Sequence, residues 1–188
     1  MPSTIKGRYF YWYMVKDIHS RLLVANEMHA CETADHASTL IRKACLRERT
    51  TGQPLVVHSD NGSAMKGAVM LATLHELGVA SSFSRPRVSN DNAYAEAPFR
   101  AAKYCPLWPE CPFDTLDEAR LWVNRFVAWY NHGHRHSALN YVTPREYPRA
   151  KPNNCRLHVP SSTPKRANDI RRAGRGKRAP GISPMTSI

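Results

Sequence analysis

The sequence predicts an α/β domain in which a mixed β-sheet is flanked by helices. Three observations lead to this prediction: a pair of strand-like segments near the amino terminus, a short apolar run at residues 55–59, and helical patterns interleaved with a later strand-like run. Strands and helices that alternate along a chain are typical of α/β domains. At 188 residues the chain is long enough for one domain with a core of its own.

Residues 7–25 predict an antiparallel hairpin. Residues 7–16 are rich in Tyr, Phe and Trp, which favour strands, and residues 21–25 form a second strand-like run beyond a four-residue turn. Residues 33–49 then place their apolar side chains at helical spacing, and Thr33 is of a type that caps helices. The domain is therefore expected to begin with two strands and an amphipathic helix.

The middle of the chain predicts a second strand pair separated by a helix. The apolar run 55–59 is bounded by the turn formers of residues 61–63, which is typical of a short buried strand. Residues 69–77 follow a short helical pattern that Gly78 ends, and residues 79–83 form the next candidate strand.

Two helices are expected in the remainder of the domain. The first covers residues 92–105 and ends before Pro106. The second starts at a capping box made of Thr115 and Glu118 and runs to about Asn131, with one apolar stripe that indicates a core helix.

The positive charge is concentrated near the carboxyl terminus. Of the net charge of +12, residues 1–148 contribute +3, from 17 Lys and Arg against 14 Asp and Glu. Residues 149–188 contribute +9, from 10 Lys and Arg against one Asp. We therefore expect a core domain over 1–147 and a Pro-, Arg- and Ser-rich tail over 148–188 that is disordered, because it shows no hydrophobic period. Such a tail could bind nucleic acid or be merely solvated.

Cysteine content and hydropathy indicate a reduced, cytoplasmic protein with no membrane partner. The five cysteines are odd in number and show no C-x-x-C pair, and no run approaches the length of a membrane span. The first residues also lack the apolar region of a secretory signal. A zinc site remains as an alternative, although its ligands would not match a standard zinc spacing; they would be Cys105, Cys111, His132, His134 and His136.

Asp60 and Glu96 are the candidate catalytic residues and metal ligands. Asp60 ends the strand at 55–59, Glu96 lies on the helix that follows, and 35 residues separate them. Carboxylates on rigid elements can hold the divalent ions that phosphodiester chemistry uses. Asn92, Arg100 and Lys103 share the helical face of Glu96 and are the candidate DNA-binding residues. A surface ion pair between Glu96 and Arg100 is the plainer alternative.

Three ordered strings resemble the catalytic core of insertion-sequence transposases of the orfB type. They are His-Ser-Asp-Asn-Gly-Ser at 58–63, Ser-Arg-Pro-Arg-Val-Ser-Asn-Asp-Asn-Ala-Tyr-Ala-Glu at 84–96, and Trp-Tyr-Asn through Arg-His-Ser-Ala-Leu to Thr-Pro at 129–144. These enzymes are related to retroviral integrases and share their ribonuclease-H-like fold. The resemblance runs from about residue 2 to residue 147.

The resemblance implies an Asp-Asp-Glu triad that holds two Mg²⁺ or Mn²⁺ ions while 3′-hydroxyl groups of transposon ends attack target DNA. Asp60 matches the second carboxylate and Glu96 the third, and Lys103 matches a basic residue expected to contact DNA near the transposon end. It also implies a homo-multimer on paired DNA ends in a bacterial cytoplasm. A helix-turn-helix module that reads those ends would lie upstream or on a separate subunit.

The first carboxylate of the triad has no clear match. In the family it lies on a strand before the hairpin, several residues ahead of the position matched by Pro2, so the core is expected to lack its first strand. Asp17 is the acidic residue on the early hairpin and is the alternative ligand, although turn formation explains it as well. Pro98 is a second departure, because a proline inside the helix could mis-aim Glu96 unless it falls in the first turn.

Three functions remain open from the sequence. A strand-transfer core is the first, and a catalytically inactive DNA-binding remnant is the second. A ribonuclease H for RNA–DNA hybrids would share the fold but would not explain the strings at 84–96 and 129–144. A gene truncated upstream and out of frame downstream would account for both the absent strand and the abrupt tail, and the flanking DNA would test this hypothesis.

Overall fold

The computed structural model describes residues 1–85, 93–148 and 155–159. Its strands and helices follow one another in the order that the sequence predicts, with two additions, α2 and β5. The strands are β1 (Tyr11–Asp17), β2 (Leu23–His29), β3 (Leu55–Ser59), β4 (Val79–Phe83) and β5 (Cys155–Val159), and the helices are α1 (Ala34–Glu48), α2 (Ser63–Lys66), α3 (Ala68–Glu76), α4 (Ala93–Lys103) and α5 (Leu116–His132), followed by a 3-10 turn at Ser137–Leu139.

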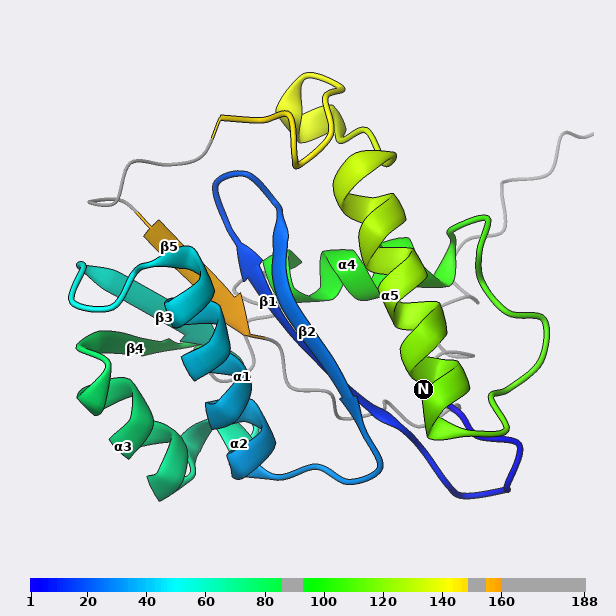
Figure 1. Ribbon diagram of the computed structural model, residues 1–188, viewed down its shortest axis with the longest axis horizontal. Coiled ribbons are helices and arrows are strands. Elements are labelled where there is room, and N and C mark those ends of the chain that lie inside the picture. Colours follow the sequence, from blue (N-terminus) through cyan, green and yellow to red (C-terminus); the bar gives the residue numbers. More distant parts are fainter. Residues whose placement is uncertain (86–92, 149–154, 160–188) are drawn as a thin grey trace, which may run out of the picture.

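The five strands form one mixed sheet in the order β2-β1-β5-β3-β4 (Figure 1). β1 and β2 form the expected antiparallel hairpin, and β3 pairs with β4 in parallel along its whole length. β5 joins the two halves, because it lies antiparallel to β1 and parallel to β3. The predicted mixed sheet with flanking helices is confirmed.

Each face of the sheet is covered by helices. On one face, α1, α2 and α3 pack on a cluster that includes Val15, Val57 and Leu157. On the other face, α4 and α5 pack on a cluster that includes Trp12 and Met14 from the alternate positions of β1. Figure 1 shows α1 in front of the sheet and α4 behind it. The core therefore consists of two apolar layers with the sheet between them.

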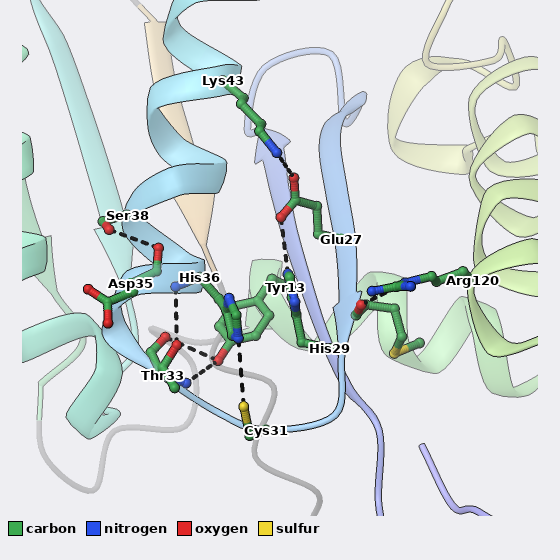
Figure 2. A network of polar contacts seen from close by, with 11 residues as sticks. Tyr13, Glu27, His29, Cys31, Thr33, Asp35, His36, Ser38, Lys43 and Arg120 are labelled. Carbon is green, nitrogen blue, oxygen red and sulfur yellow. Dashed lines mark hydrogen bonds and ion pairs between the residues drawn. The ribbon is translucent and has the colours of Figure 1, made fainter. Parts of the chain in front are cut away.

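The start of α1 is fixed by a residue of the sheet. The Thr33 hydroxyl accepts a hydrogen bond from the amide of His36 at 3.2 Å, which confirms Thr33 as the cap. The Thr33 amide in turn donates to the Tyr13 hydroxyl at 2.9 Å, and that hydroxyl donates to the Thr33 carbonyl at 3.3 Å (Figure 2). Tyr13 on β1 thus aligns the first turn of α1 with the sheet.

The predicted capping box at the start of α5 is present with one difference. The Thr115 hydroxyl accepts from the amide of Glu118 at 3.1 Å, and the Glu118 carboxylate accepts from the amide of Asp114 at 2.9 Å. In a capping box the Glu118 carboxylate would accept from the amide of the cap residue, Thr115, whereas here it accepts from the residue before it. The apolar stripe of α5 lies in the core as expected, with Phe126 0% exposed and its ring 5.5 Å from that of Trp12.

β5 lies in the segment that the sequence assigned to a disordered tail, and that expectation is wrong for residues 155–159. Leu157 is buried, and the backbone of β5 pairs with a strand on each side. Backbone pairing does not depend on composition, so a short central strand needs few apolar residues of its own. The rest of the tail, residues 149–154 and 160–188, lies outside the described residues. In the part of the chain that is described, no helix is long and apolar enough to cross a membrane.

Candidate active site

Asp60 comes directly after β3, as the sequence predicts. Its side chain is half-buried, and its Oδ1 accepts a hydrogen bond from the amide of Gly62 at 3.0 Å. This bond from a carboxylate to an amide two residues on is an Asx-turn, which holds the carboxylate at the end of the strand. Asp60 is therefore placed by the sheet and by its own turn rather than by a long loop.

The loop that carries Asp60 is tied to the end of β4. The Asn61 side-chain amide donates to the Ser84 carbonyl at 2.6 Å, and the Ser84 amide donates to the Ser59 carbonyl at 3.0 Å. Two residues before Asp60, the His58 ring bonds the hydroxyls of Ser82 at 3.0 Å and Ser84 at 3.2 Å. These contacts give the His-Ser-Asp-Asn string a structural role in fixing Asp60.

Glu96, Arg100 and Lys103 share the exposed face of α4, as helical spacing predicts. The opposite face is anchored in the core, where Ala102 is 1% exposed and the Phe99 ring lies 5.4 Å from the Trp12 ring. α4 therefore presents one carboxylate and two cations to the surface. The third candidate on this face, Asn92, lies outside the described residues.

Pro98 lies inside α4 and not in its first turn. The helix begins at Ala93, so Pro98 follows Glu96 within the regular helix, and it is buried. A proline has no amide to donate to the carbonyl four residues earlier, which here belongs to Tyr94. The turn that lacks this hydrogen bond contains Glu96, which is the position where the sequence analysis expected Pro98 to disturb the helix.

The elements that carry Asp60 and Glu96 both adjoin β5. α4 contacts β5, and β5 pairs with β3 up to Ser59, the residue before Asp60. The sequence of β5 is Cys-Arg-Leu-His-Val and contains no carboxylate.

Across residues 1–85, 93–148 and 155–159, no group of three or more His, Cys, Asp or Glu side chains is placed to hold a metal ion. Carboxylate oxygens are the ligand type that Mg²⁺ prefers, and the described residues include both candidate carboxylates, those of Asp60 and Glu96. The zinc alternative finds no support among them.

Asp17, the alternative ligand, caps a turn. Its carboxylate accepts from the amide of His19 at 3.1 Å, and from the amide and hydroxyl of Ser20 at 3.1 and 2.5 Å. These bonds close the turn between β1 and β2. The structure thus supports the turn-forming role that the sequence also allowed for Asp17.

A buried cation lies beside Asp17 and was not predicted. Lys16 is 2% exposed, and burial lowers its pKa to about 7, with a further lowering by Arg21 that Asp17 partly opposes. His136 lies in the same region, and burial, followed by the charges of His134, Lys16 and Arg21, lowers its pKa to about 4. The aromatic residues around Lys16 marked a strand, but no signal in the sequence showed that this lysine is buried.

Asn131, in the string at 129–144, fastens the edge of the sheet. Its Oδ1 accepts from the Leu23 amide and its Nδ2 donates to the Leu23 carbonyl, both at 3.0 Å. The Asn131 carbonyl also accepts from the amide of Arg145 at 3.0 Å. Beyond it, the Glu146 carboxylate accepts from the Thr143 amide at 3.0 Å and caps a last turn. The string therefore has the structural role expected of it after the last long helix.

A polar network between β2 and α1 contains metal-binding residue types other than the predicted site residues (Figure 2). His29 Nε2 lies 3.1 Å from the Glu27 carboxylate, and the His29 and His36 rings stack with their centres 3.7 Å apart. His36 Nε2 lies 3.7 Å from the Cys31 sulfur. Each Nε2 atom thus has its own partner, and the stacked rings join β2 to the start of α1.

A groove of about 460 Å³ runs along the outer edge of β2. Leu23, Arg47, Val127 and Asn131 are among the residues that line it. Asp60, Glu96, Arg100 and Lys103 do not line it, whereas His132, one of the zinc candidates, does. The candidate active site around Asp60 and α4 is therefore not this groove.

Comparisons with known proteins agree with this architecture. Two family models, both described as "Integrase core domain", match residues 1–89 and residues 77–144. The solved structures that resemble the chain include the simian T-cell lymphotropic virus intasome in complex with PP2A regulatory subunit B56 gamma, with a TM-score of 0.61 and 16% identity over 81% of this chain and 56% of that chain. They also include the HTLV-2 integrase catalytic core domain in complex with magnesium in its trimeric form, with a TM-score of 0.54 and 15% identity over 78% of this chain and 90% of that chain.

A bacterial protein is more similar in sequence. The transposase for insertion sequence element IS904 of Lactococcus lactis is 30% identical over 133 residues, which are 70% of this chain and 51% of that protein. The chain thus spans about half the length of the curated relative that it matches. The fold is that of ribonuclease-H-like integrase cores. The chain carries an integrase core domain, matched over residues 1–144, and is similar in sequence to an insertion-sequence transposase.

Proposed function

We propose that the chain is the catalytic core of an insertion-sequence transposase that joins DNA ends with the help of divalent metal ions. The observation that carries this proposal is the placement of Asp60 at the end of a central strand, with its turn tied to β4. Rigid support of this kind is what a metal-binding carboxylate needs. The HTLV-2 integrase core, which shares the fold, was solved with magnesium.

Asp60 and Glu96 would hold Mg²⁺ or Mn²⁺, which would stabilise charge on the attacking and leaving oxygens of the phosphodiester. The chain's own residues position the DNA around these carboxylates. Arg100 and Lys103 extend from the same exposed face of α4 as Glu96, where they could bind backbone phosphates. The net charge of +12 favours association with DNA and makes it sensitive to salt.

The DNA partners would be transposon ends and target DNA, bound by a multimer of the chain. The simian virus structure that shares the fold was solved as an intasome and the HTLV-2 core in a trimeric form, which supports multimerisation of this chain. A helix-turn-helix module for end recognition would be contributed by another segment or subunit.

One observation favours a second candidate, a catalytically inactive DNA-binding remnant. β5 adjoins both carboxylate-bearing elements and contains no carboxylate in its sequence. A site with two acidic ligands binds a hard cation more weakly than a site with three. In this second candidate, the fold and the basic surface persist while strand transfer is lost.

End joining by the purified full chain distinguishes these candidates. The assay uses a labelled duplex with the element's terminal sequence, a supercoiled target, and Mg²⁺ or Mn²⁺. We expect joining that Glu96→Gln reduces by about 10²-fold or more, because the metal-binding carboxylate is lost while the helix is kept. Glu110→Gln is the matched control on an exposed residue and should leave joining unchanged.

DNA binding at two salt concentrations completes the test. Both candidates predict binding that weakens with salt. Binding with no joining in either metal would favour the remnant, and cleavage of an RNA–DNA hybrid in place of joining would favour a ribonuclease H. Joining that survives Glu96→Gln would contradict the assigned role of Glu96.

A further inference from the structure

The connection from α4 to α5 (Figure 1) begins with a turn that is held against α5. Pro106 has no amide with which to continue the helix. The amide of Trp108 donates to the Cys105 carbonyl at 3.1 Å, which closes a β-turn with the proline at its second position. The Trp122 indole of α5 donates to the Leu107 carbonyl. The backbone of this turn is therefore fixed in place.

The turn presents large apolar side chains to the surface. Tyr104 is 72% exposed, and Leu107 and Trp108 are 41% and 39% exposed. The Trp108 ring meets the Trp122 ring edge-on, with the ring centres 5.5 Å apart, and is anchored by this contact. The Lys103 ammonium lies 5.7 Å from the centre of the Tyr104 ring. We call Tyr104, Leu107 and Trp108 the apolar turn, and exposed apolar groups gathered in one place often mark a binding site.

The charges beside the apolar turn favour a nucleic-acid strand as its partner. Arg100 and Lys103 lie on the exposed face of α4, four residues and one residue before Tyr104. An apolar protein surface would have to desolvate these cations, whereas a nucleic-acid strand brings phosphates to the cations and a base to the ring. Cations that follow the backbone and aromatic rings that stack on bases are the combination by which proteins hold single strands.

A tyrosine ring can stack on a base only where the base has a free face. Bases inside a duplex are stacked on both sides, so free faces occur on unpaired nucleotides and at strand ends. Tyr104 follows Glu96 by eight residues, which is a distance of about 12 Å at the helical rise of about 1.5 Å per residue. This distance corresponds to about three to four base steps of 3.4 Å.

We propose that Tyr104 is a base-stacking residue that receives an unpaired nucleotide of a DNA strand held along α4 by Arg100 and Lys103. The stacked nucleotide would lie about three to four base steps from the phosphate that reacts beside Glu96. This distance from the reacting phosphate rests on the proposed function. The stacking itself rests on the exposure of Tyr104, the fixed turn that carries it and the cations next to it.

Binding of the full chain to two DNA probes in EDTA tests the stacking in the absence of chemistry. One probe is a short blunt duplex, and the other is the same duplex with a single-stranded overhang of about five nucleotides, enough to span α4. Fluorescence anisotropy measures both dissociation constants. We expect Tyr104→Ala to weaken binding to the overhang probe by about fivefold or more and to leave binding to the blunt duplex unchanged.

Two matched variants separate the ring from its hydroxyl and from exposure alone. Tyr104→Phe keeps the ring and should bind the overhang as the wild type does. Tyr141→Ala removes another exposed tyrosine, 68% exposed and remote from α4 in sequence, and should change neither constant. Lys103→Ala should weaken both probes alike, because a phosphate contact does not depend on whether the base is paired.

A 2-aminopurine base in the overhang reports the stacking directly, since its fluorescence falls when it stacks. We expect quenching when the wild type or Tyr104→Phe binds, and markedly less when Tyr104→Ala binds at a saturating concentration. Wild-type binding that leaves the fluorescence unchanged at every overhang position would overturn the assignment of Tyr104, and this measurement needs no variant that must fold.

The remaining outcomes also decide. Equal losses on the two probes in Tyr104→Ala, or no loss on either, would overturn the role in stacking. A shift in oligomeric state of Tyr104→Ala in sedimentation velocity, with unchanged binding to both probes, would assign the apolar turn to a contact between copies of the chain instead. Stacking by a chain that joins no DNA would support the role of Tyr104 while contradicting the proposed function, and joining without stacking would do the reverse.

Discussion

At the scale of single residues, Asn131 has the best-defined role in the fold. β2 is an edge strand, so Leu23 presents an amide and a carbonyl that no further strand can pair. The Asn131 side chain supplies both bonds at 3.0 Å, and no other side chain of its size offers a donor and an acceptor in this geometry. Asn131 thereby joins the end of α5 to the sheet.

Asn131→Ala should lower the free energy of unfolding by about 1–3 kcal/mol, because two backbone groups of Leu23 lose their partners. Urea unfolding at pH 7 measures the change. Asn124→Ala, an exposed position on the same helix, is the control and should change the free energy by less than about 0.5 kcal/mol. Equal effects of the two substitutions would show that the contact with Leu23 contributes nothing.

Lys16 should make stability depend on pH above neutrality. Burial, then the charge of Arg21, lowers its pKa from 10.5 to about 7 in the folded chain. Between these two values the unfolded chain binds the proton and the folded chain does not, so stability rises with pH by up to about 1.4 kcal/mol per unit. Below about pH 7 Lys16 is protonated in both states, so it no longer makes the free energy of unfolding depend on pH.

Lys16→Met should remove that rise and stabilise the chain most below pH 7. Urea unfolding from pH 6 to pH 9 measures both effects, with Lys6→Met at an exposed position as the control. A slope that is the same in the wild type and Lys16→Met would mean that Lys16 keeps its ordinary pKa.

At the scale of elements, local signals determined which parts could be predicted. β3, β4, α1 and α5 have a cap, a turn or an apolar period within their own residues, and each was predicted to within about two residues of its bounds. β5 has no such signal, because its backbone pairs with strands about 100 or more residues away in sequence. α4 was predicted to end before Pro106, which it does, although Pro98 lies within it.

Thr115→Ala should lower the free energy of unfolding by about 1 kcal/mol, because the first turn of α5 loses its side-chain cap. Thermal or urea unfolding measures the loss. Thr39→Ala, at an exposed position within α1, is the control and should be neutral or slightly stabilising, since alanine favours helices. A loss of the same size at Thr39 would show that the effect of Thr115→Ala does not come from capping.

At the scale of the whole molecule, the sequence predicted where Asp60 and Glu96 lie in the fold but not what surrounds them. Asp60 follows β3 and Glu96 lies on α4 with Arg100 and Lys103, as expected, and their role in catalysis stays a prediction. The bonds from Asn61 and His58 to the end of β4, and the place of β5 next to both carboxylate-bearing elements, depend on contacts between distant segments. Such contacts are set by the packing of the complete fold, so no local pattern reports them.

The position of a bound Mn²⁺ ion tests the central claim that Asp60 and Glu96 form a metal-dependent active site. Crystals of the full chain soaked in MnCl₂ would be measured at the manganese absorption edge, with Glu96→Gln crystals treated in the same way. We predict an anomalous peak in contact with carboxylate oxygens of Asp60 and Glu96 in the wild type, and its loss or marked weakening in Glu96→Gln. A wild-type peak that contacts neither carboxylate, or no peak at all, would contradict the claim.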